Sequence, residues 1–210
     1  FGLGIWLFVA TAQEWASRIK LFRAPFSESL RRARNLPRAS HGMTLAHLGL
    51  AVCIFGFVGS SAWKEDLIVF AEPGTEVQVA GFDLRLEGVE EVPGPNYTAF
   101  RATLVVSRDG EFLQNLYPER RNYPVARSQT TESAIRHSLA GDLYASIAEP
   151  ASQTAGEAWT LRVLYEPLVN FIWLGSFMLV LGGALSLSDR RLRVGAPRRA
   201  KAPEMAQPAE

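Results

Sequence analysis

Two stretches of the chain are apolar for long enough to cross a lipid bilayer. Residues 44–62 contain no Lys, Arg, Asp or Glu, and residues 168–187 carry only Asn170 and two serines as polar side chains. A helix of about 20 residues is roughly 30 Å long, which matches the hydrocarbon core of a membrane. We therefore predict a membrane-spanning helix in each stretch, within residues 42–63 and 167–188.

A third apolar stretch opens the sequence. Residues 1–12 are apolar, but Gln13 and Glu14 follow, and about 12 residues are too few for an ordinary span. A signal peptide would need a basic segment before its apolar core, and the sequence shows none. We expect residues 1–17 to be a truncated transmembrane helix, so that the chain is a fragment of a larger polytopic protein.

The charged residues predict how the spans are oriented. Residues 18–41 carry seven basic side chains against one acidic one, residues 189–210 carry six against three, and residues 64–166 carry nine against 16. Because Lys and Arg gather on the cytoplasmic side, we expect the first two segments to be cytoplasmic and the third to lie across the membrane. Basic runs can also bind nucleic acid, but beside spans they are typical orientation signals, so no nucleic-acid partner is predicted.

The region between the spans has the pattern of short strands. Alternation and β-branched residues predict seven strands, over residues 67–71, 76–79, 82–89, 100–107, 111–116, 142–148 and 158–164. Turns are expected at Ala80-Gly81, at Asp109-Gly110 and at residues 93–97. One short helix is predicted over residues 131–139, which begin with Thr and Glu. The domain is therefore expected to be all-β, either a small barrel or a sandwich.

Composition narrows the possible chemistry. The 210 residues are 48% apolar and 20% charged, with a net charge of +1, which excludes a disordered, collagen-like or disulfide-rich chain. The single cysteine, Cys53, permits no internal disulfide and no Cys-based metal cage. The β-rich region carries no catalytic or phosphate-binding motif. Any metal chemistry must therefore use His, carboxylates or a cofactor.

His47 is the residue that points most directly to chemistry. It lies inside the first predicted span, where an ionisable side chain is costly unless it faces protein, water or a cofactor. A neutral imidazole coordinates iron without a bare charge, so His47 is a candidate haem or metal ligand. The alternative is a simple hydrogen bond to a neighbouring helix, and this segment alone does not choose between the two.

Helical spacing separates His47 from a stripe of small residues. The stripe follows alternating steps of three and four residues, which lets a second helix approach closely, and it consists of Gly42, Ala46, Gly49, Cys53, Gly56 and Ser60. Met43, His47 and Leu50 project from a different face. If the stripe packs against a helix, His47 faces an apolar wall that suits a porphyrin. Cys53 is then a small buried apolar side chain.

The remaining polar candidates have simpler interpretations. His41 lies at the basic edge of the span, and His137 has no His or Cys at ligand spacing and is expected at the surface. Residues 119–121, together with aromatic residues such as Tyr123 and Trp159, could bind a peptide or an anion. Pairing of the two arginines with nearby acids is the simpler prediction. A docking or positioning role is therefore favoured for this domain over catalysis.

Several segments, taken in order, resemble a known family. They are GMTLAHLGLAV (42–52), GPNY (94–97), YPERRNYPV (117–125), TESAI (131–135), DLY (142–144) and WTLRVLYEPLVNFIWLGSFMLVLGGALSLSDRR (159–191). The set is similar to the C-terminal part of CcmF, a cytochrome c maturation protein. The resemblance covers nearly the whole chain, and the family's members are much longer polytopic inner-membrane proteins.

The resemblance implies a haem lyase subunit of the bacterial inner membrane with a periplasmic domain. In this family, haem from the periplasmic chaperone CcmE is joined through thioether bonds to the C-x-x-C-H motif of an apocytochrome c, which CcmH-type proteins hold. A b-type haem also lies between two transmembrane histidines, with quinol as the electron source. The AHLG histidine of the family maps onto His47 as an axial ligand of the haem b iron. His41 and His137 match no family histidine, and no catalytic residue is assigned.

Together these predictions describe a membrane α-helical protein with an inserted periplasmic all-β domain. Its parts are a truncated helix (1–17), a basic cytoplasmic loop (18–41), a span with His47 (42–63), a β-rich domain (64–166), a second span (167–188) and a basic, disordered cytoplasmic tail (189–210). The fragment alone is expected to be inactive as a lyase. Two alternatives remain: a non-catalytic membrane-anchored periplasmic adaptor and a subunit of a haem export system.

Overall fold

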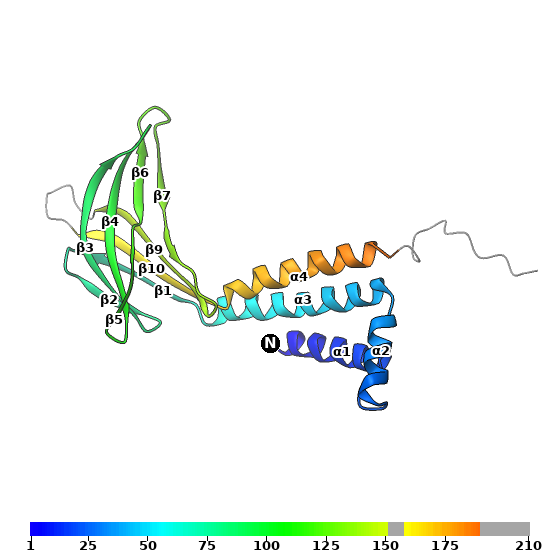
Figure 1. Ribbon diagram of the computed structural model, residues 1–210. Helices are drawn as coiled ribbons and strands as arrows, with labels where there is room; N and C mark the ends of the chain where they lie inside the picture. The colour runs from blue at the N-terminus through cyan, green and yellow to red at the C-terminus, as the bar shows by residue number, and fades with distance from the viewer. Residues whose placement is uncertain (151–157, 190–210) are drawn as a thin grey trace, which may run out of the picture. The chain divides into compact units, whose positions relative to one another are not determined.

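The computed structural model describes residues 1–150 and 158–189. The chain divides into two compact units, one formed by residues 1–4 and 52–175 and the other by residues 5–51 and 176–210 (Figure 1). The first unit contains every described strand, and the second is helical. The residues of the expected disordered tail beyond Asp189 lie outside the described ranges.

Two antiparallel sheets make up the β-rich part of the first unit. The smaller sheet has the order β1 (Glu65–Ala71), β10 (Trp159–Pro167), β9 (Gly141–Pro150) and β8 (Ala134–Arg136). The larger sheet has the order β2 (Glu76–Val79), β3 (Phe82–Pro93), β4 (Thr98–Arg108), β6 (Glu119–Tyr123) and β7 (Ser128–Glu132). Strand β5 (Glu111–Leu116) pairs with the end of β4, and β6 pairs with its beginning.

The core lies between the inner faces of the two sheets. The larger sheet contributes alternate residues of β3 and β4, such as Leu84, Leu86 and Leu104, and the smaller sheet contributes Leu161 and Val163, all fully buried in one cluster. Each such side chain stabilises the fold by roughly 1.5–3 kcal/mol relative to exposure. The pattern of residues left a barrel and a sandwich open, and this face-to-face packing is that of a sandwich.

Two predicted turns have the backbone that tight hairpins need. Ala80 and Gly81 have φ angles of 51° and 76°, and Asp109 and Gly110 have φ angles of 52° and 79°. Two successive residues with positive φ match the right-handed twist of the flanking strands. The turn at residues 93–97 is also confirmed, because the Gly94 N–H donates to the Tyr97 carbonyl at 2.8 Å.

The predicted helix over residues 131–139 is wrong. Strand β7 ends at Glu132, strand β8 follows, and a turn leads into β9. Strands β6 and β7 are polar and lack an apolar alternation, so periodicity did not reveal them. Cross-strand bonds stabilise them instead: Arg120 donates to Thr131 at 2.9 Å and to Gln129 at 2.7 Å.

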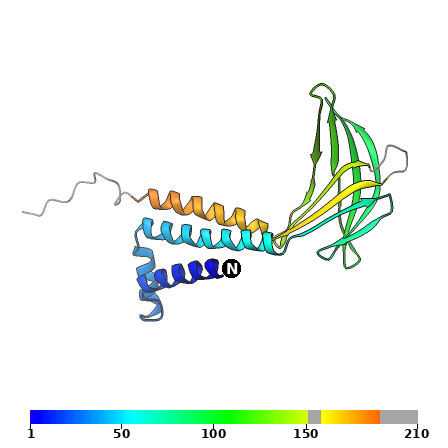
Figure 2. The same ribbon diagram turned by 180° about the vertical axis from the view of Figure 1, so that it is seen from behind.

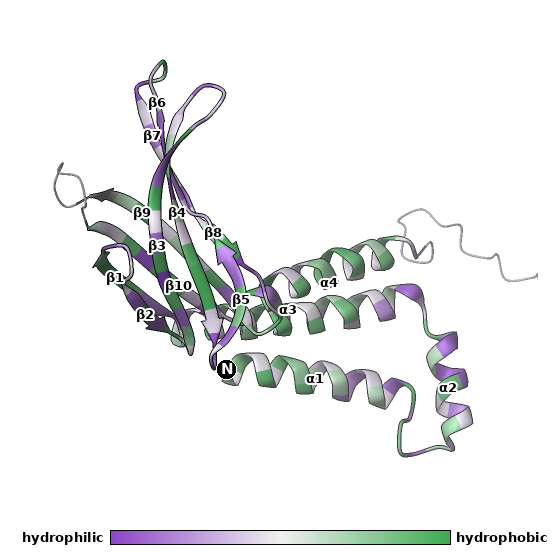
Figure 3. Cartoon of the chain, turned by 60° about the vertical axis from the view of Figure 1, so that its left-hand side comes forward, coloured by the Kyte–Doolittle hydropathy of each residue, from purple (hydrophilic) through white to green (hydrophobic). Residues whose placement is uncertain are grey.

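Four helices complete the described chain, and two of them are strongly apolar. They are α1 (Gly2–Arg18), α2 (Phe26–Asn35), α3 (Arg38–Ala62) and α4 (Val169–Leu187). By length and composition α3 and α4 could each cross a membrane, and no other helix in the described ranges meets both criteria. Figure 3 shows their mostly hydrophobic colouring, in contrast to the hydrophilic α2.

The predicted stripe of small residues packs α3 against α4. In the helical unit, a β-carbon on Gly42 would lie 2.5 Å from the Gly182 carbonyl oxygen, and in the first unit one on Gly56 would lie 2.6 Å from the Ile172 nitrogen. Both views of the ribbon show the two helices side by side (Figures 1 and 2). Close approach of this kind requires residues without bulky side chains, which explains Gly42 and Gly56 in α3 and Gly182 in α4.

Candidate functional site

His47 lies in α3 with one ring nitrogen held by the helix itself. Its Nδ1 is 2.8 Å from the carbonyl oxygen of Met43, one turn earlier. A carbonyl oxygen only accepts, so Nδ1 carries the proton in this hydrogen bond. When the ring is neutral, the free lone pair is then on Nε2. Nε2 is therefore the atom that a metal or haem iron would bind.

The packing of α3 leaves His47 on an exposed face. Ala46 contacts α4, since a β-carbon on Gly182 would lie 2.5 Å from its backbone nitrogen. The next residue along a helix lies about 100° further round, so His47 points away from this contact. His47 and Leu50 are both exposed, whereas Ala51 is fully buried. The imidazole is therefore free on one side of α3 with apolar neighbours along the helix.

His41 and Cys53 have structural roles. The Nε2 of His41 lies 2.9 Å from the carbonyl oxygen of Ala33 in the last turn of α2, which also accepts from the Leu36 N–H at 3.3 Å. Cys53 is buried in the small-residue stripe, with its Sγ 3.4 Å from the carbonyl oxygen of Ile172. The prediction that Cys53 is a small buried side chain is confirmed.

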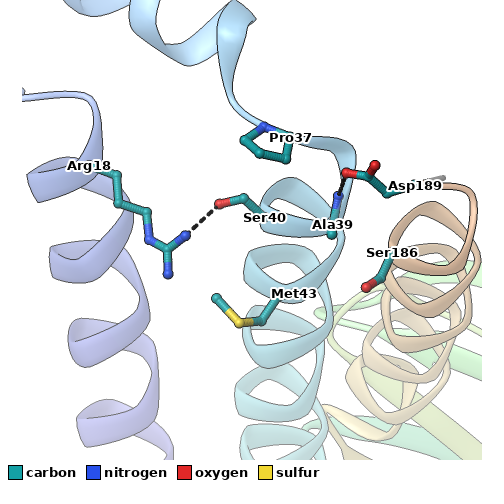
Figure 4. Close-up of a pocket in the computed structure, with 7 residues that line it drawn as sticks. All are labelled: Arg18, Pro37, Ala39, Ser40, Met43, Ser186 and Asp189. Atoms are coloured by element: carbon teal, nitrogen blue, oxygen red, sulfur yellow. Dashed lines mark hydrogen bonds between the residues drawn. The ribbon is translucent and has the colours of Figure 1, made fainter. Parts of the chain in front are cut away.

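A pocket of about 500 Å³ lies at the start of α3, within the helical unit. It is lined by Arg18, Pro37, Ala39, Ser40, Met43, Ser186 and Asp189 (Figure 4). Arg18 donates to Ser40 Oγ at 2.9 Å, and the Ala39 N–H donates to the Asp189 carboxylate at 3.1 Å. Met43 lines this pocket with its side chain and holds the His47 ring with its carbonyl group. The pocket and the imidazole therefore share one residue.

The arginines near Glu119 form ion pairs within the domain. Glu119 is 8% exposed and accepts from Arg101 at 2.7 Å and from Arg121 at 2.8 Å. Burial by itself would raise the pKa of Glu119, but the hydrogen bonds from Arg121 and Arg101 outweigh it and hold that pKa below its usual value. The simpler prediction, pairing of arginines with acids, is confirmed for Arg121. The Trp159 ring lies with its centroid 5.1 Å from that of Phe100, a residue of β4 that pairs with Arg120 of β6.

A second polar group joins the β-rich domain to α4. His137 is exposed, as predicted, but its Nδ1 lies 2.7 Å from Oδ2 of the buried Asp142. Asn170, in the first turn of α4, donates to the other Asp142 oxygen at 2.7 Å and to the Ser138 carbonyl at 2.7 Å. Sequence analysis missed this group because no motif links three residues from three different elements.

The buried Asp142 also affects its neighbour Tyr144. Desolvation raises the pKa of the Tyr144 hydroxyl, and the negative charges of Asp142 and Glu166 raise it further. A network with a buried carboxylate and several donors fixes local geometry. The polar atoms of His137, Asp142 and Asn170 bond to one another and to Ser138, so we interpret the group as a structural junction.

Metal-binding clusters are absent from residues 1–150 and 158–189, where no three His, Cys, Asp or Glu side chains come together. His137 has one carboxylate partner and His41 has one carbonyl partner. His47 likewise has one carbonyl partner, so each histidine has a second ring nitrogen without a hydrogen-bond partner in the described chain, and His47 is the one that lies within the apolar run of residues 44–62.

Comparison with known proteins identifies the family. The family model described as the CcmF C-terminal beta-sandwich matches residues 62–167. The chain belongs to the CcmF family. The matched residues begin at the end of α3 and end with β10, so the described sandwich is the CcmF domain.

CcmF relatives match over most of this chain. It is 40% identical over 209 residues to the cytochrome c-type biogenesis protein CycK of Bradyrhizobium diazoefficiens, covering 100% of this chain and 31% of that protein. It is 41% identical over 162 residues to CcmF of Pseudomonas aeruginosa, covering 77% of this chain and 24% of that protein. The chain therefore spans less than a third of the length of these curated relatives.

A solved structure has the same fold. The cytochrome c heme lyase CcmF superposes with a TM-score of 0.64 at 19% identity, covering 89% of this chain and 29% of that chain. The expected C-terminal part of CcmF is thus confirmed in both sequence family and fold. The proposed role of His47 is a separate question, which depends on the geometry above.

Proposed function

We propose that this chain is the C-terminal part of a CcmF haem lyase subunit and that His47 is an axial ligand of a b-type haem. The observation that carries the proposal is the hydrogen bond from His47 Nδ1 to the Met43 carbonyl on an exposed residue of α3, which leaves Nε2 as the ring nitrogen that could bind iron. The names of the relatives, which refer to cytochrome c biogenesis and heme lyase, support this assignment.

The proposal places α3 and α4 across the bacterial inner membrane. Their length and apolar composition support this placement. The basic residues 18–41 would then face the cytoplasm and the β-sandwich the periplasm, in keeping with the distribution of positive charge. In this setting His47 lies within the apolar layer, where a neutral ring is less costly than a charged one.

The residues around His47 fit a porphyrin. The Met43 carbonyl orients the imidazole through Nδ1, as a second hydrogen-bonding partner does for most metal-bound histidines. Leu50 is exposed one turn further along α3, and an apolar side chain is a suitable neighbour for a haem face. Bound between two imidazoles, the haem would supply one-electron transfer without binding oxygen. The second ligand would come from another part of the family's chain.

The β-sandwich would position partners rather than perform chemistry. Its edge strand β1 carries the exposed side chains Ile68 and Phe70 on one face. Exposed apolar residues on a sheet edge are typical of contact surfaces. In the proposed complex these partners are the haem chaperone CcmE, CcmH-type subunits and the apocytochrome c, while quinol reduces the haem. The same surface also fits the alternative function, a membrane-anchored adaptor.

Absorption spectra of the complete family protein test the role of His47. His47→Ala should remove or strongly weaken the reduced b-haem bands while membrane insertion is unchanged, because the iron loses one axial ligand. The matched control is His41→Ala, which alters a histidine on the same helix whose Nε2 contacts Ala33. A normal reduced-haem spectrum in His47→Ala would refute the assignment.

Two further results would separate the alternatives. A complete wild-type protein that purifies without haem absorbance would favour the adaptor. Haem accumulation outside the cytoplasm that depends on the protein, with no effect on attachment to apocytochrome c, would favour an export subunit.

A further inference from the structure

The short helix α2 and the loop before it present apolar side chains to solvent. Phe22 is 94% exposed, Phe26 is 76% exposed and Leu30 is 41% exposed. They follow each other at intervals of four residues, so Phe26 and Leu30 lie on one side of α2 and Phe22 precedes them. Aromatic rings exposed to this degree are costly in water, which indicates that something covers them.

The backbone holds these rings outward. Lys20 and Phe22 have positive φ angles of 55° and 65°, so the loop is tightly turned before α2 begins. Ser29 is buried and its hydroxyl donates to the Lys20 carbonyl at 3.3 Å, which fastens α2 to the loop. Phe22 and Phe26 therefore belong to a fixed surface.

Positive charge surrounds the apolar side chains. Residues 20–38 contain six basic residues and a single acidic one, Glu28, which pairs with Arg31 and Arg32. The other four basic residues of this segment form no ion pair within the part of the chain that the structure describes. They are Lys20, Arg23, Arg34 and Arg38. Unpaired positive charge beside aromatic rings is complementary to a negatively charged apolar boundary.

Two hollows of the helical unit are lined in part by arginines of this segment. One, of about 410 Å³, is lined by residues that include Arg31, Arg32 and their partner Glu28. The other, of about 530 Å³, is lined by residues that include Arg34, Arg38 and Asp189, so that the basic residues outnumber the acidic one in each hollow. Basic pockets beside membrane helices bind phospholipid headgroups. Both hollows are formed largely by α2 and the start of α3.

We propose that residues 20–38 form an interfacial surface that binds anionic phospholipids. Phe22 and Phe26 insert among the lipids, and the arginines of this segment that form no ion pair contact the lipid headgroups. This inference rests on the proposed membrane placement of α3 and α4. It assigns to the α2 segment a lipid partner that is independent of haem binding.

Fluorescent probes in lipid nanodiscs test the proposal. Cys53→Ser gives a cysteine-free chain, into which Ser27→Cys places a probe on α2 and, in a separate variant, Val180→Cys places one on α4. Nitroxide-labelled lipids should quench the α2 probe about twofold more in discs with phosphatidylglycerol than in discs of phosphatidylcholine alone. The α4 probe should be quenched equally in both.

Charge variants identify the cause. Replacing Arg23, Arg34 and Arg38 by Gln should reduce quenching of the α2 probe to its phosphatidylcholine value. The matched control replaces three basic residues of the sandwich, Lys64, Arg85 and Arg127, by Gln and should change nothing. Circular dichroism confirms that each variant keeps its helices.

The remaining outcomes overturn the inference in distinguishable ways. Equal quenching of the α2 probe in both lipids excludes anionic recognition. If the α4 probe is quenched but the α2 probe is not, protein rather than lipid covers Phe22 and Phe26. If the α4 probe is also unquenched, the membrane placement itself fails, and the proposed function fails with it.

Discussion

Gly182 of α4 lies directly against Ala46 of α3. A β-carbon on Gly182 would be 2.5 Å from the Ala46 nitrogen and 2.6 Å from the Gly42 carbonyl oxygen. The turn of α3 that is supported in this way continues into His47. The position of the imidazole therefore depends on a glycine in another helix.

Substitution of Gly182 should disturb this support. Gly182→Ala should destabilise the helix pair by about 1–3 kcal/mol, because backbone atoms cannot move aside as a flexible side chain can. Unfolding in detergent measures the loss, and a weaker haem spectrum in the complete protein would report a displaced His47. Gly183→Ala is the matched control, since nothing lies within 4 Å of its added β-carbon. Equal effects of the two substitutions would contradict the close packing.

Glu119 should make the β-sandwich sensitive to acid. Its pKa is lowered in the folded state, so the stability it contributes is present above the model-peptide value of 4.5 and is lost as the pH falls through the folded-state pKa. Glu119→Gln should lose about 1–3 kcal/mol at neutral pH, since hydrogen bonds from charged donors are removed. Denaturant unfolding at several pH values provides the measurement.

The control for this experiment is Glu90→Gln, which alters an exposed glutamate on β3. It should leave both the stability and its pH dependence unchanged. If the acid-induced loss persists undiminished in Glu119→Gln, another carboxylate is responsible.

Asp142 should control the titration of Tyr144. Asp142→Asn removes a negative charge that helps to raise the Tyr144 pKa, so this pKa should fall toward its usual value of 10.0 while the contribution of burial stays. NMR of ring-labelled tyrosine follows the titration. Glu111→Gln, on the distant β5 strand, serves as the control. An unchanged Tyr144 pKa would mean that burial and Glu166 raise it without a contribution from Asp142.

The Asp109-Gly110 turn gives a test of backbone conformation. Gly110 has a φ of 79° and open space around it, so Gly110→Ala should cost roughly 1–2 kcal/mol through the left-handed conformation alone. Gly88→Ala, also in open space, has no such constraint and should be neutral or slightly stabilising in β3. Comparison of the two unfolding free energies isolates the effect of φ.

The strands that sequence analysis predicted are those with one buried face. Residues 76–79 and 111–116 match β2 and β5 exactly in extent, and the other predicted strands match their counterparts apart from their ends. Alternation is visible there because apolar residues face the core. Strands β6 and β7 were missed since hydrogen bonds and ion pairs, such as the bond from Arg120 to Thr131, hold them in place of apolar burial. Strand β8 was missed because its three residues are too few to show an alternation.

The candidate site was predictable in part. An ionisable residue within an apolar run singled out His47, and helical spacing identified the face that packs against α4. The bond to the Met43 carbonyl required the structure, because it depends on the side-chain rotamer. The junction of His137, Asp142 and Asn170 could not be predicted, since it depends on the meeting of the turn after β8 with β9 and α4.

The Asn170 contacts restrict how α4 can respond to its surroundings. Two hydrogen bonds tie the first turn of this helix to Asp142 and Ser138 of the sandwich. In the proposed membrane setting, α4 cannot slide along the bilayer normal without carrying the sandwich with it, because its first turn is hydrogen-bonded to Asp142 and Ser138. Thinner or thicker membranes must then be accommodated by tilting or at the Leu187 end of the helix.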